Sequence, residues 1–230
     1  MPTAWNSSNN IEKNTPKIAI AIPYNGKFEP EWVEKTWRHL RCTPLNWCTK
    51  IVFYSKVPSL PVARDSLVNQ ALQTDCHYVF FLDSDMIFET PEDPNVALDT
   101  LYQCMNKDPN SKEGKIVSGL YRAKQKQGFG WAAWMKVHEK GFTPIQNWTG
   151  NWIKIDATGL GCCLIDMCIF RNIPKPWFYW EVQGDISEDF YFFQLAAKFG
   201  YDTHLFTDVK LSHLGGLKVK SDGTIVIADM

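Results

Sequence analysis

The sequence predicts an α/β fold in which a sheet is flanked by crossover helices, built as a single domain. In the first half of the chain, apolar β-rich runs alternate with amphipathic stretches. One of these runs, residues 77–82, shows no alternation between apolar and polar positions, which is typical of a strand covered on both faces. No internal repeat and no Gly/Ser linker divides the 230 residues, and their 45% apolar content can bury one substantial core.

The helices and strands of the first half are predicted from the spacing of apolar residues and from the positions of prolines. Strands are expected at residues 17–23, 50–54, 77–82 and 116–121, and helices at 30–40, 59–73 and 95–105. Pro30 stands at the start of the first helix, in which Val33, Trp37 and Leu40 recur at helical spacing. Pro44 ends that run.

The second half is Trp-rich and punctuated by Gly, and its expected strands cover residues 130–137, 152–155 and 162–170. Ser187 is expected to cap a helix with Glu188 and Asp189 in its first turn, ending near Lys198. A last strand carries His213. The alternating first half and the Trp-rich second half are therefore expected to have different functions.

The bulk properties exclude some partners and locations. The 24 basic and 25 acidic residues are scattered along the chain, so no large basic field suits a nucleic-acid backbone. No run approaches the roughly 20 apolar residues of a membrane span, and the N-terminal residues do not resemble a secretory signal. The seven cysteines lack paired metal-type spacing and are expected as buried thiols in a reducing compartment. We therefore expect a cytoplasmic protein with no transmembrane segment.

Asp83-Ser84-Asp85 directly follows the run 77–82, and this position gives a short motif its weight. After a buried parallel strand, both carboxylates emerge at the carboxyl end of the sheet, where open α/β folds bind ligands. A divalent cation held there, Mg²⁺ or Mn²⁺, can neutralise a diphosphate leaving group. The alternative is a turn or cap in which Asp83 and Asp85 only bond backbone amides.

Two further sets of residues allow a functional and a structural interpretation. His213 is either a structural residue or a third metal ligand, and an imidazole among oxygen ligands fits Mn²⁺ better than Mg²⁺. Glu188 and Asp189 either stabilise a helix N-terminus, at about 0.3–1 kcal/mol, or place a carboxylate where it can deprotonate an acceptor hydroxyl.

The ten tryptophans are many for a chain of this length, and indole rings stack on sugars as well as fill cores. Some tryptophans of the irregular half should line a pocket: Trp131, Trp134, Trp148, Trp152, Trp177 and Trp180. Residues 127–131 join glycines to large aromatics, which suggests a loop that orders over substrate. Phe129 or Trp131 is then expected to border the binding site of the acceptor, the molecule that carries the hydroxyl to be deprotonated. The alternative is that both rings pack beneath the sheet.

Two stretches, SLPVARDSLVNQAL (59–72) and CHYVFFLDSDM (76–86), resemble GT-A glycosyltransferases of the family 2-like kind. In that family a helix carrying Ala-Arg-Asn precedes the strand that ends in the Asp-x-Asp motif. The resemblance runs from Lys17 to about Gly216, and it adds Gly159-Leu160-Gly161 before an apolar strand, the acidic helix start at 187–189 and the late His213.

The resemblance implies a GT-A type (Rossmann-like) fold with a mixed, mainly parallel sheet flanked by helices. It divides the domain 16–230, which follows a flexible tail 1–15, into a nucleotide-binding half 16–121 and an acceptor-binding half 122–218. The activity implied is metal-dependent transfer of a sugar from a nucleotide-diphosphate donor of the UDP or GDP type to a hydroxyl of a glycan, lipid or protein.

The resemblance also implies roles for individual residues. Those expected to hold the nucleotide sugar are Pro23, Tyr24, Arg64, Asp65, Asp83, Ser84, Gly159 and Gly161. The expected metal ligands are Asp83, Asp85 and His213, and Asp189, with Glu188 beside it, is expected to activate the acceptor in an inverting reaction. The glycines would let the backbone approach the donor sugar.

One residue departs from the family pattern, since Asp65 stands where the family usually has Asn, which changes the expected nucleotide contacts. The main alternatives are a retaining α-mannosyl-type transferase of the same fold and a non-catalytic carbohydrate-binding protein. Haloacid dehalogenase phosphatases carry Asp-x-Asp after the first strand, and sugar nucleotidylyltransferases have a Gly-rich loop with Arg and Lys there. Here Asp-x-Asp follows the third strand and runs on to Met86, which argues against the phosphatases. The chain has only PYNGKF after its first strand, which argues against the nucleotidylyltransferases.

Overall fold

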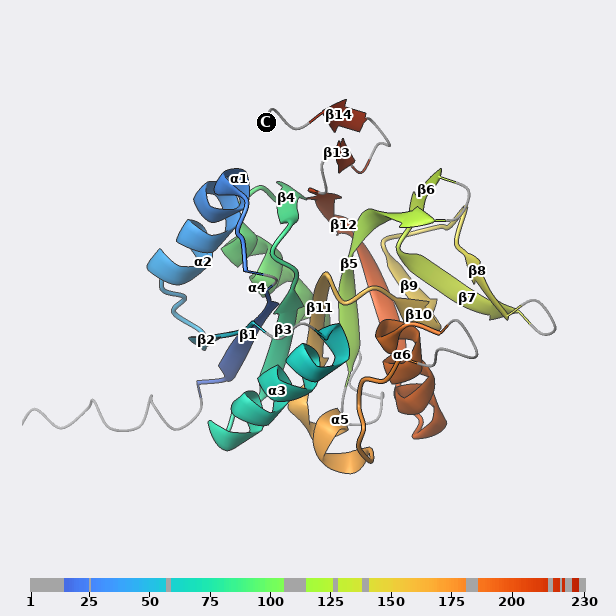
Figure 1. The fold of residues 1–230 in the computed structure, drawn as a ribbon, viewed down its shortest axis with the longest axis horizontal. Coiled ribbons are helices and arrows are strands. Elements are labelled where there is room, and N and C mark those ends of the chain that lie inside the picture. Colours follow the sequence, from blue (N-terminus) through green and yellow to red (C-terminus); the bar gives the residue numbers. More distant parts are fainter. Residues whose placement is uncertain are drawn as a thin grey trace, which may run out of the picture.

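The main sheet forms the centre of the computed structural model, with its strands in the order β14-β13-β12-β5-β11-β3-β1-β2 (Figure 1). The structure describes residues 15–24, 26–56, 59–105, 115–125, 128–137, 141–180, 186–214, 217–219, 221 and 225–227. The strands of this path are β1 (Lys17–Pro23), β2 (Thr49–Ser55), β3 (Tyr78–Leu82), β5 (Ile116–Gln125), β11 (Cys162–Asp166), β12 (Thr203–His213), β13 (Leu217–Val219) and β14 (Ile225–Ile227).

Further strands extend this sheet or form a small second one. β4 (Met86–Thr90) and β9 (Trp152–Ile155) pair with β12, and β6 (Gly128–Trp131) pairs with β5. The second sheet has the order β10 (Ala157–Thr158), β7 (Ala133–Val137), β8 (Gly141–Pro144).

Strand directions confirm the predicted fold class. β1 runs parallel to β2 and β3, and β12 runs parallel to β5. β11 is antiparallel to both of its neighbours, β3 and β5. The fold is therefore a mixed α/β sheet with a mainly parallel centre and helices on both faces.

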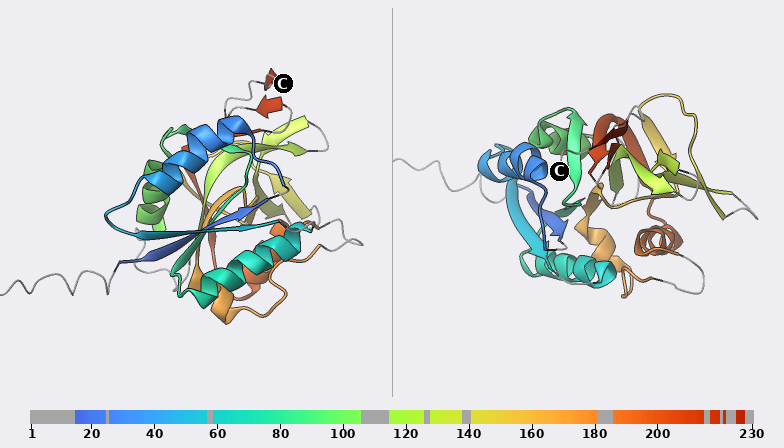
Figure 2. Two further views of the ribbon diagram at one scale, coloured as in Figure 1. Left: turned by 60° about the vertical axis from the view of Figure 1, so that its left-hand side comes forward. Right: turned by 45° about the horizontal axis from the view of Figure 1, so that its top comes forward.

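The two faces carry different helices (Figures 1 and 2). α3 (Leu60–Gln73), α5 (Met167–Asn172) and α6 (Glu188–Lys198) lie on one face, and α1 (Pro30–Trp32), η1 (Val33–Trp37), α2 (Arg38–Cys42) and α4 (Pro94–Met105) lie on the other. In β1, Ile18, Ile20 and Ile22 pack in the core below α1, α2 and α4, whereas Ala19 and Ala21 pack towards α3 and α6. Successive side chains of a strand point to opposite faces, so the Ile/Ala alternation gives α3 a flat surface to lie on.

The first helix buries Leu40 as expected, and Trp37 packs partly buried against the core, but Val33 is 37% exposed, and Trp32 and Thr36 are buried in its place. The reason is that η1 is a turn of π-helix, which shifts the residues that follow relative to a regular α-helix. The Thr36 hydroxyl donates to the Met86 carbonyl at 3.1 Å, which fixes this helix to the start of β4.

Two other expectations are wrong in detail. The strand expected at 162–170 ends at Asp166, because the carboxylate of Asp166 accepts a hydrogen bond from the Cys168 amide at 2.8 Å and caps α5. The loop expected at 127–131 is largely the strand β6, whose Phe129 pairs with Lys124 of β5. Gln127, and the tail up to residue 14, lie outside the described residues.

Two further findings concern the helices and the cysteines. No helix in the described part of the chain is both long and apolar enough to cross a membrane. All seven cysteines fall within the described ranges and carry free thiols, of which Cys42 is exposed.

Candidate functional site

The Asp83-Ser84-Asp85 turn joins β3 to β4 at the carboxyl end of the sheet, as predicted from its position after a buried strand. Main-chain hydrogen bonds hold it on two sides: the Asp83 amide donates to the Gly161 carbonyl at 3.1 Å, and the Leu214 amide donates to the Asp85 carbonyl at 2.6 Å. The turn is therefore fixed to β11 and to the end of β12.

Asp85 and His213 lie in contact, as the predicted metal site requires. The Nε2 atom of His213 is 3.3 Å from Oδ2 of Asp85, and the antiparallel pairing of β4 with β12 places His213 opposite Met86. The other oxygen of Asp85, Oδ1, is buried and has no hydrogen-bond partner among the described residues. Burial raises the pKa of Asp85 to about 6, which His213 partly counters and Asp83 reinforces.

Asp83 faces a different partner. Its carboxylate lies 3.4 Å from the Nη2 atom of Arg64, and no group of three or more His, Cys, Asp or Glu side chains in the described ranges is arranged to hold a metal. Asp85 and His213 still fit Mg²⁺ or Mn²⁺, because such ions are commonly held by one or two protein ligands together with water and substrate phosphates. The orphaned Oδ1 of Asp85 is the atom that such an ion would satisfy.

Arg64 is the hub of an acidic cluster made of Asp83, Glu188 and Asp189. Its side chain is only 1% exposed, and its Nη1 atom contacts both Glu188 and Asp189. Arg64 comes from the first turns of α3, and Glu188 and Asp189 begin α6, so the guanidinium joins the two helices on this face of the sheet. Its predicted contact with the nucleotide stays a prediction, whereas its contact with the acidic cluster is a finding that the sequence did not indicate.

Opposing influences act on the pKa of Asp189. Burial raises its pKa to about 7; the Arg64 guanidinium lowers it, and the charges of Glu188 and Asp83 raise it. The hydroxyl of Ser187, the expected cap, bonds no amide among the residues described at this helix start. The acidic start of α6 is therefore explained by Arg64 more than by capping.

Tyr121 is a residue of this site that sequence reasoning missed. Its hydroxyl accepts a hydrogen bond from the Gly161 amide at 3.1 Å, and burial raises its pKa well above the ordinary value, with Asp83 and Asp189 adding to the rise. It stands at the end of the apolar part of β5, and nothing in the sequence sets it apart from other strand residues.

The glycines at 159 and 161 are explained by packing. A Cβ atom on Gly159 would lie 2.2 Å from the Tyr121 hydroxyl, and one on Gly161 would lie 2.4 Å from Cε of Met86. Real Cβ atoms do not come this close to other atoms, so a side chain at position 159 would displace the Tyr121 ring, and one at position 161 would displace the flexible end of Met86, whether or not a donor sugar approaches. The predicted approach of the sugar stays a prediction.

Three other residues predicted to hold the nucleotide have protein contacts of their own: Pro23, Tyr24 and Asp65. Pro23 is the buried last residue of β1, and the Tyr24 ring stacks on Phe28 with centroids 4.3 Å apart. Asp65 is half-buried, and burial raises its pKa, which Lys175 and the backbone of Phe178 and Trp177 partly counter. Its Oδ1 atom is buried and has no hydrogen-bond partner among the described residues.

Of the two predicted acceptor residues, the structure describes the side chain of Trp131 alone. Trp131 stacks beneath the Arg122 guanidinium, 4.1 Å from the ring centroid, and meets Trp148 edge to face at 5.5 Å. Both indoles line a cavity of about 320 Å³.

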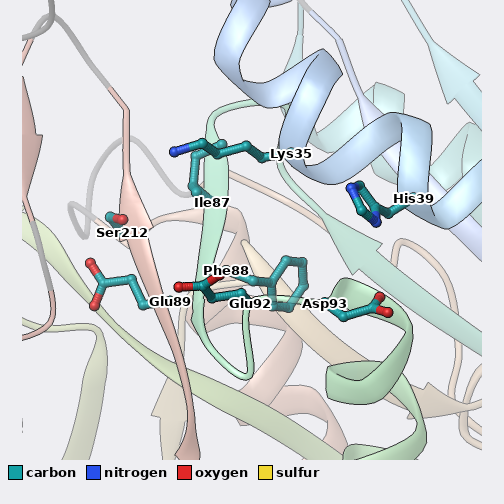
Figure 3. A pocket seen from close by; sticks show the side chains of 8 residues that line it. All are labelled: Lys35, His39, Ile87, Phe88, Glu89, Glu92, Asp93 and Ser212. Carbon is teal, nitrogen blue, oxygen red and sulfur yellow. The ribbon is translucent and has the colours of Figure 1, made fainter.

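A larger cavity, of about 610 Å³, lies beside β4 (Figure 3). Lys35 and His39 project towards it from the first helix, over Ile87 of β4, and Glu92 and Asp93 lie opposite. None of the eight side chains that line it is a predicted site residue, so cavity size does not mark the centre of the predicted chemistry.

Comparison with solved structures concerns the fold. The crystal structure of A197 from STIV matches with a TM-score of 0.63 at 18% sequence identity, covering 94% of this chain and 95% of that one. At this identity the likeness shows a similar fold and nothing about activity.

More distant structures match over much of the chain. A protein described as a glucose-1-phosphate thymidylyltransferase from Bacillus anthracis has a TM-score of 0.45 at 9% identity, covering 86% of this chain and 89% of that one. Mannose-1-phosphate geranyltransferase from Thermus thermophilus has a TM-score of 0.43 at 11% identity, with 86% and 75% covered. These scores are too low to bear on function. A scan against protein-family models and a search of curated proteins found no match.

Proposed function

We propose that the chain is a metal-dependent glycosyltransferase that moves a sugar from a nucleotide-diphosphate donor to a hydroxyl acceptor with inversion. One observation carries the proposal: Asp85 with His213, and Asp83 with Asp189 around Arg64, converge at the carboxyl end of β3 from distant parts of the chain. Such a reaction needs ligands for a metal ion and a nearby base. Asp85 and His213 are suited to the first role, and Asp189, with its raised pKa, to the second.

The metal would be held by Asp85 and His213, with water and the donor diphosphate completing its shell. When bound, Mg²⁺ or Mn²⁺ would offset the negative charge that develops on the departing diphosphate. Pro23, Tyr24, Asp65 and Ser84 are the residues proposed to lie along the nucleotide.

Asp189 is the proposed general base. An Asp189 oxygen takes the proton of the acceptor hydroxyl while that hydroxyl oxygen bonds to the anomeric carbon of the donor sugar. The bond from that carbon to the diphosphate breaks on the opposite side, and its electron pair leaves with the diphosphate. A pKa of about 7 suits this role, because the carboxylate is partly ionised near neutral pH and is still basic enough to accept a proton.

Arg64 is proposed as a positioning residue. Because it contacts Asp83 and Asp189 at once, it fixes the distance between the metal side and the base side of the site. Its charge also keeps the pKa of Asp189 from rising further, so that a base is present at neutral pH.

A thermal-shift screen of UDP-, GDP- and dTDP-sugars, with and without Mn²⁺, tests the proposal. A ligand at 100 times its dissociation constant stabilises the folded state by about 2.7 kcal/mol. We expect one nucleotide class to raise the melting temperature only when Mn²⁺ is present, and the same class to be hydrolysed slowly.

The controls separate the alternatives. Asp85→Ala should lose the Mn²⁺-dependent shift, whereas Lys35→Ala, which breaks an exposed ion pair, should keep it. Absence of any metal-dependent shift would contradict the proposal, and binding of simple saccharides without nucleotide binding would favour a carbohydrate-binding protein. A product that keeps the donor's anomeric configuration would show a retaining enzyme and remove the base role from Asp189.

A further inference from the structure

The cavity that Trp131 and Trp148 line is built by an irregularity in β12. Against β5, the pairing runs from Phe206 opposite Gly119 directly to Lys210 opposite Leu120, so that residues 207–209 have no partner on β5. Such bulges bend a strand and redirect its side chains. Here Val209 enters the core, and Thr207, Asp208 and Lys210 line the cavity.

The wall opposite the bulge is rigid and aromatic. Arg122 covers one face of Trp131 and donates to the Ser221 carbonyl at 3.2 Å, while Trp148 stands perpendicular to Trp131. Ser221 is held in turn by Glu89, which accepts from its hydroxyl at 2.6 Å. These contacts hold the Trp131 and Trp148 rings in place without a ligand, so that little conformational entropy is lost when a ligand binds.

The polar side of the cavity offers an acceptor and a donor next to each other. The Asp208 carboxylate is oriented by the Asn151 amide at 2.7 Å, and the Lys210 ammonium and the Thr207 hydroxyl lie along the same strand. A hydroxyl group both donates and accepts, so neighbouring hydroxyls suit this pair. An anionic ligand would meet Asp208, and a cationic one would meet Lys210, so a neutral polyol fits best.

We propose that this cavity is a binding subsite for a neutral hexopyranose ring. At about 320 Å³ the cavity is at the small end of ligand sites, which suits one ring. Two indoles line it, and indole rings are surfaces on which sugar rings stack; because Arg122 covers one face of Trp131, Trp148 is the ring that the ligand is expected to need most. The ligand class follows from the combination of stacking surface, paired charges and size.

The subsite is separate from the reaction centre. Leu120 lines the cavity, whereas the adjacent Tyr121 reaches the acidic cluster, and successive residues of a strand face opposite sides. A sugar bound here is therefore not the one that reacts. Resting on the proposed transferase function, its role is to hold a sugar unit of the acceptor that is remote from the reacting hydroxyl; the binding itself does not depend on that function.

Saturation-transfer NMR with methyl glucoside, methyl mannoside and methyl galactoside tests the subsite. At least one glycoside should receive saturation from the wild-type protein at millimolar concentration. Trp148→Ala should abolish the transfer, and Asp208→Asn should weaken binding about tenfold, by loss of a charge-assisted hydrogen bond. Trp180→Ala is the matched control, because Trp180 is 53% exposed and lies outside the cavity.

Two variants and a competition experiment separate this subsite from misfolding and from the reaction centre. Asp208 is exposed, so Asp208→Asn tests the site even if Trp148→Ala fails to fold. Asp189→Asn should bind the glycoside normally, and UDP with Mn²⁺ should not compete with it, whatever the outcome for the proposed transferase function. No transfer to any glycoside, equal loss in Trp180→Ala, or competition by UDP with Mn²⁺ would each overturn the subsite.

Discussion

Replacing Arg64 by Met should destabilise the protein in a way that depends strongly on pH. Methionine keeps most of the aliphatic stem, so the change removes the charge and its contacts with Asp83, Glu188 and Asp189. Removing one partner of a buried ion pair costs about 3–5 kcal/mol, because the charge left behind is uncompensated. Against a total stability of about 5–15 kcal/mol, this is a large fraction.

The pH dependence follows from the pKa of Asp189. This pKa is already raised to about 7, and Arg64 lowers it, so removal of Arg64 should raise it further. An unfolded Asp titrates near pH 3.9. Between these values the folded variant binds more protons than the unfolded chain, so its stability falls as pH rises. The wild type loses stability in the same way up to its own Asp189 pKa of about 7, so the loss caused by the substitution should be smaller at pH 5, where Asp189 is protonated in both proteins, and larger at pH 8.

Urea unfolding followed by Trp fluorescence at pH 5 and pH 8 measures this difference. With a slope of about 3 kcal/mol per molar urea, a loss of 3–5 kcal/mol moves the midpoint by roughly 1–1.7 M at pH 8. Lys35→Met is the control, because the Lys35–Glu31 pair is exposed and should contribute at most about 0.5 kcal/mol. Equal losses at the two pH values, or a loss below about 1 kcal/mol at pH 8, would refute the assignment of Arg64 as the charge hub.

Three other outcomes are expected. Transfer by the wild type, measured as kcat/KM, should rise with pH through an ionisation near 7, and Asp189→Asn should lower kcat by roughly 10²–10⁴ and remove that ionisation; a wild-type profile that is flat from pH 5 to 9 would argue against Asp189 as the base. Gly159→Ala should lower stability by about 1–3 kcal/mol in thermal unfolding, because its methyl would meet the Tyr121 hydroxyl, and Tyr121→Phe in the same chain should restore most of the loss; no rescue would mean that another contact is responsible. Asp85→Ala should nearly abolish turnover and weaken Mn²⁺-dependent nucleotide binding in calorimetry while the fold stays intact, and activity that survives chelators would remove this residue from the mechanism.

The parts of the fold that local pattern controls were predictable from the sequence. β1 has the predicted limits, and α3 ends at Gln73 as expected, because alternation, prolines and helical spacing all act within a few residues. The position of Asp85 and His213 near each other was also expected, since both follow strands that reach the same end of the sheet.

The parts that depend on long-range register were not predictable. Arg64 meets Glu188 across 124 residues, and no local signal pairs one buried arginine with one acidic helix start. Tyr121 enters the site because of the face that β5 turns towards Gly161, and the cavity beside Trp131 is lined by β12 where residues 207–209 have no partner on β5. Each of these depends on how strands far apart in sequence align, which a single sequence does not encode in any short window.

The pairing of β12 with β4 also determines at which point of synthesis the candidate site can assemble. The turn that carries Asp85 is synthesised about 100 residues before the helix that begins with Glu188 and the strand that ends in His213. Until these elements dock, Arg64 has no Glu188 or Asp189 to bind, and Asp85 has no imidazole beside it. A chain interrupted before residue 187 would carry Arg64 and Asp85 without the residues that contact them. Under the proposed chemistry, incomplete chains cannot waste activated sugar by hydrolysing it.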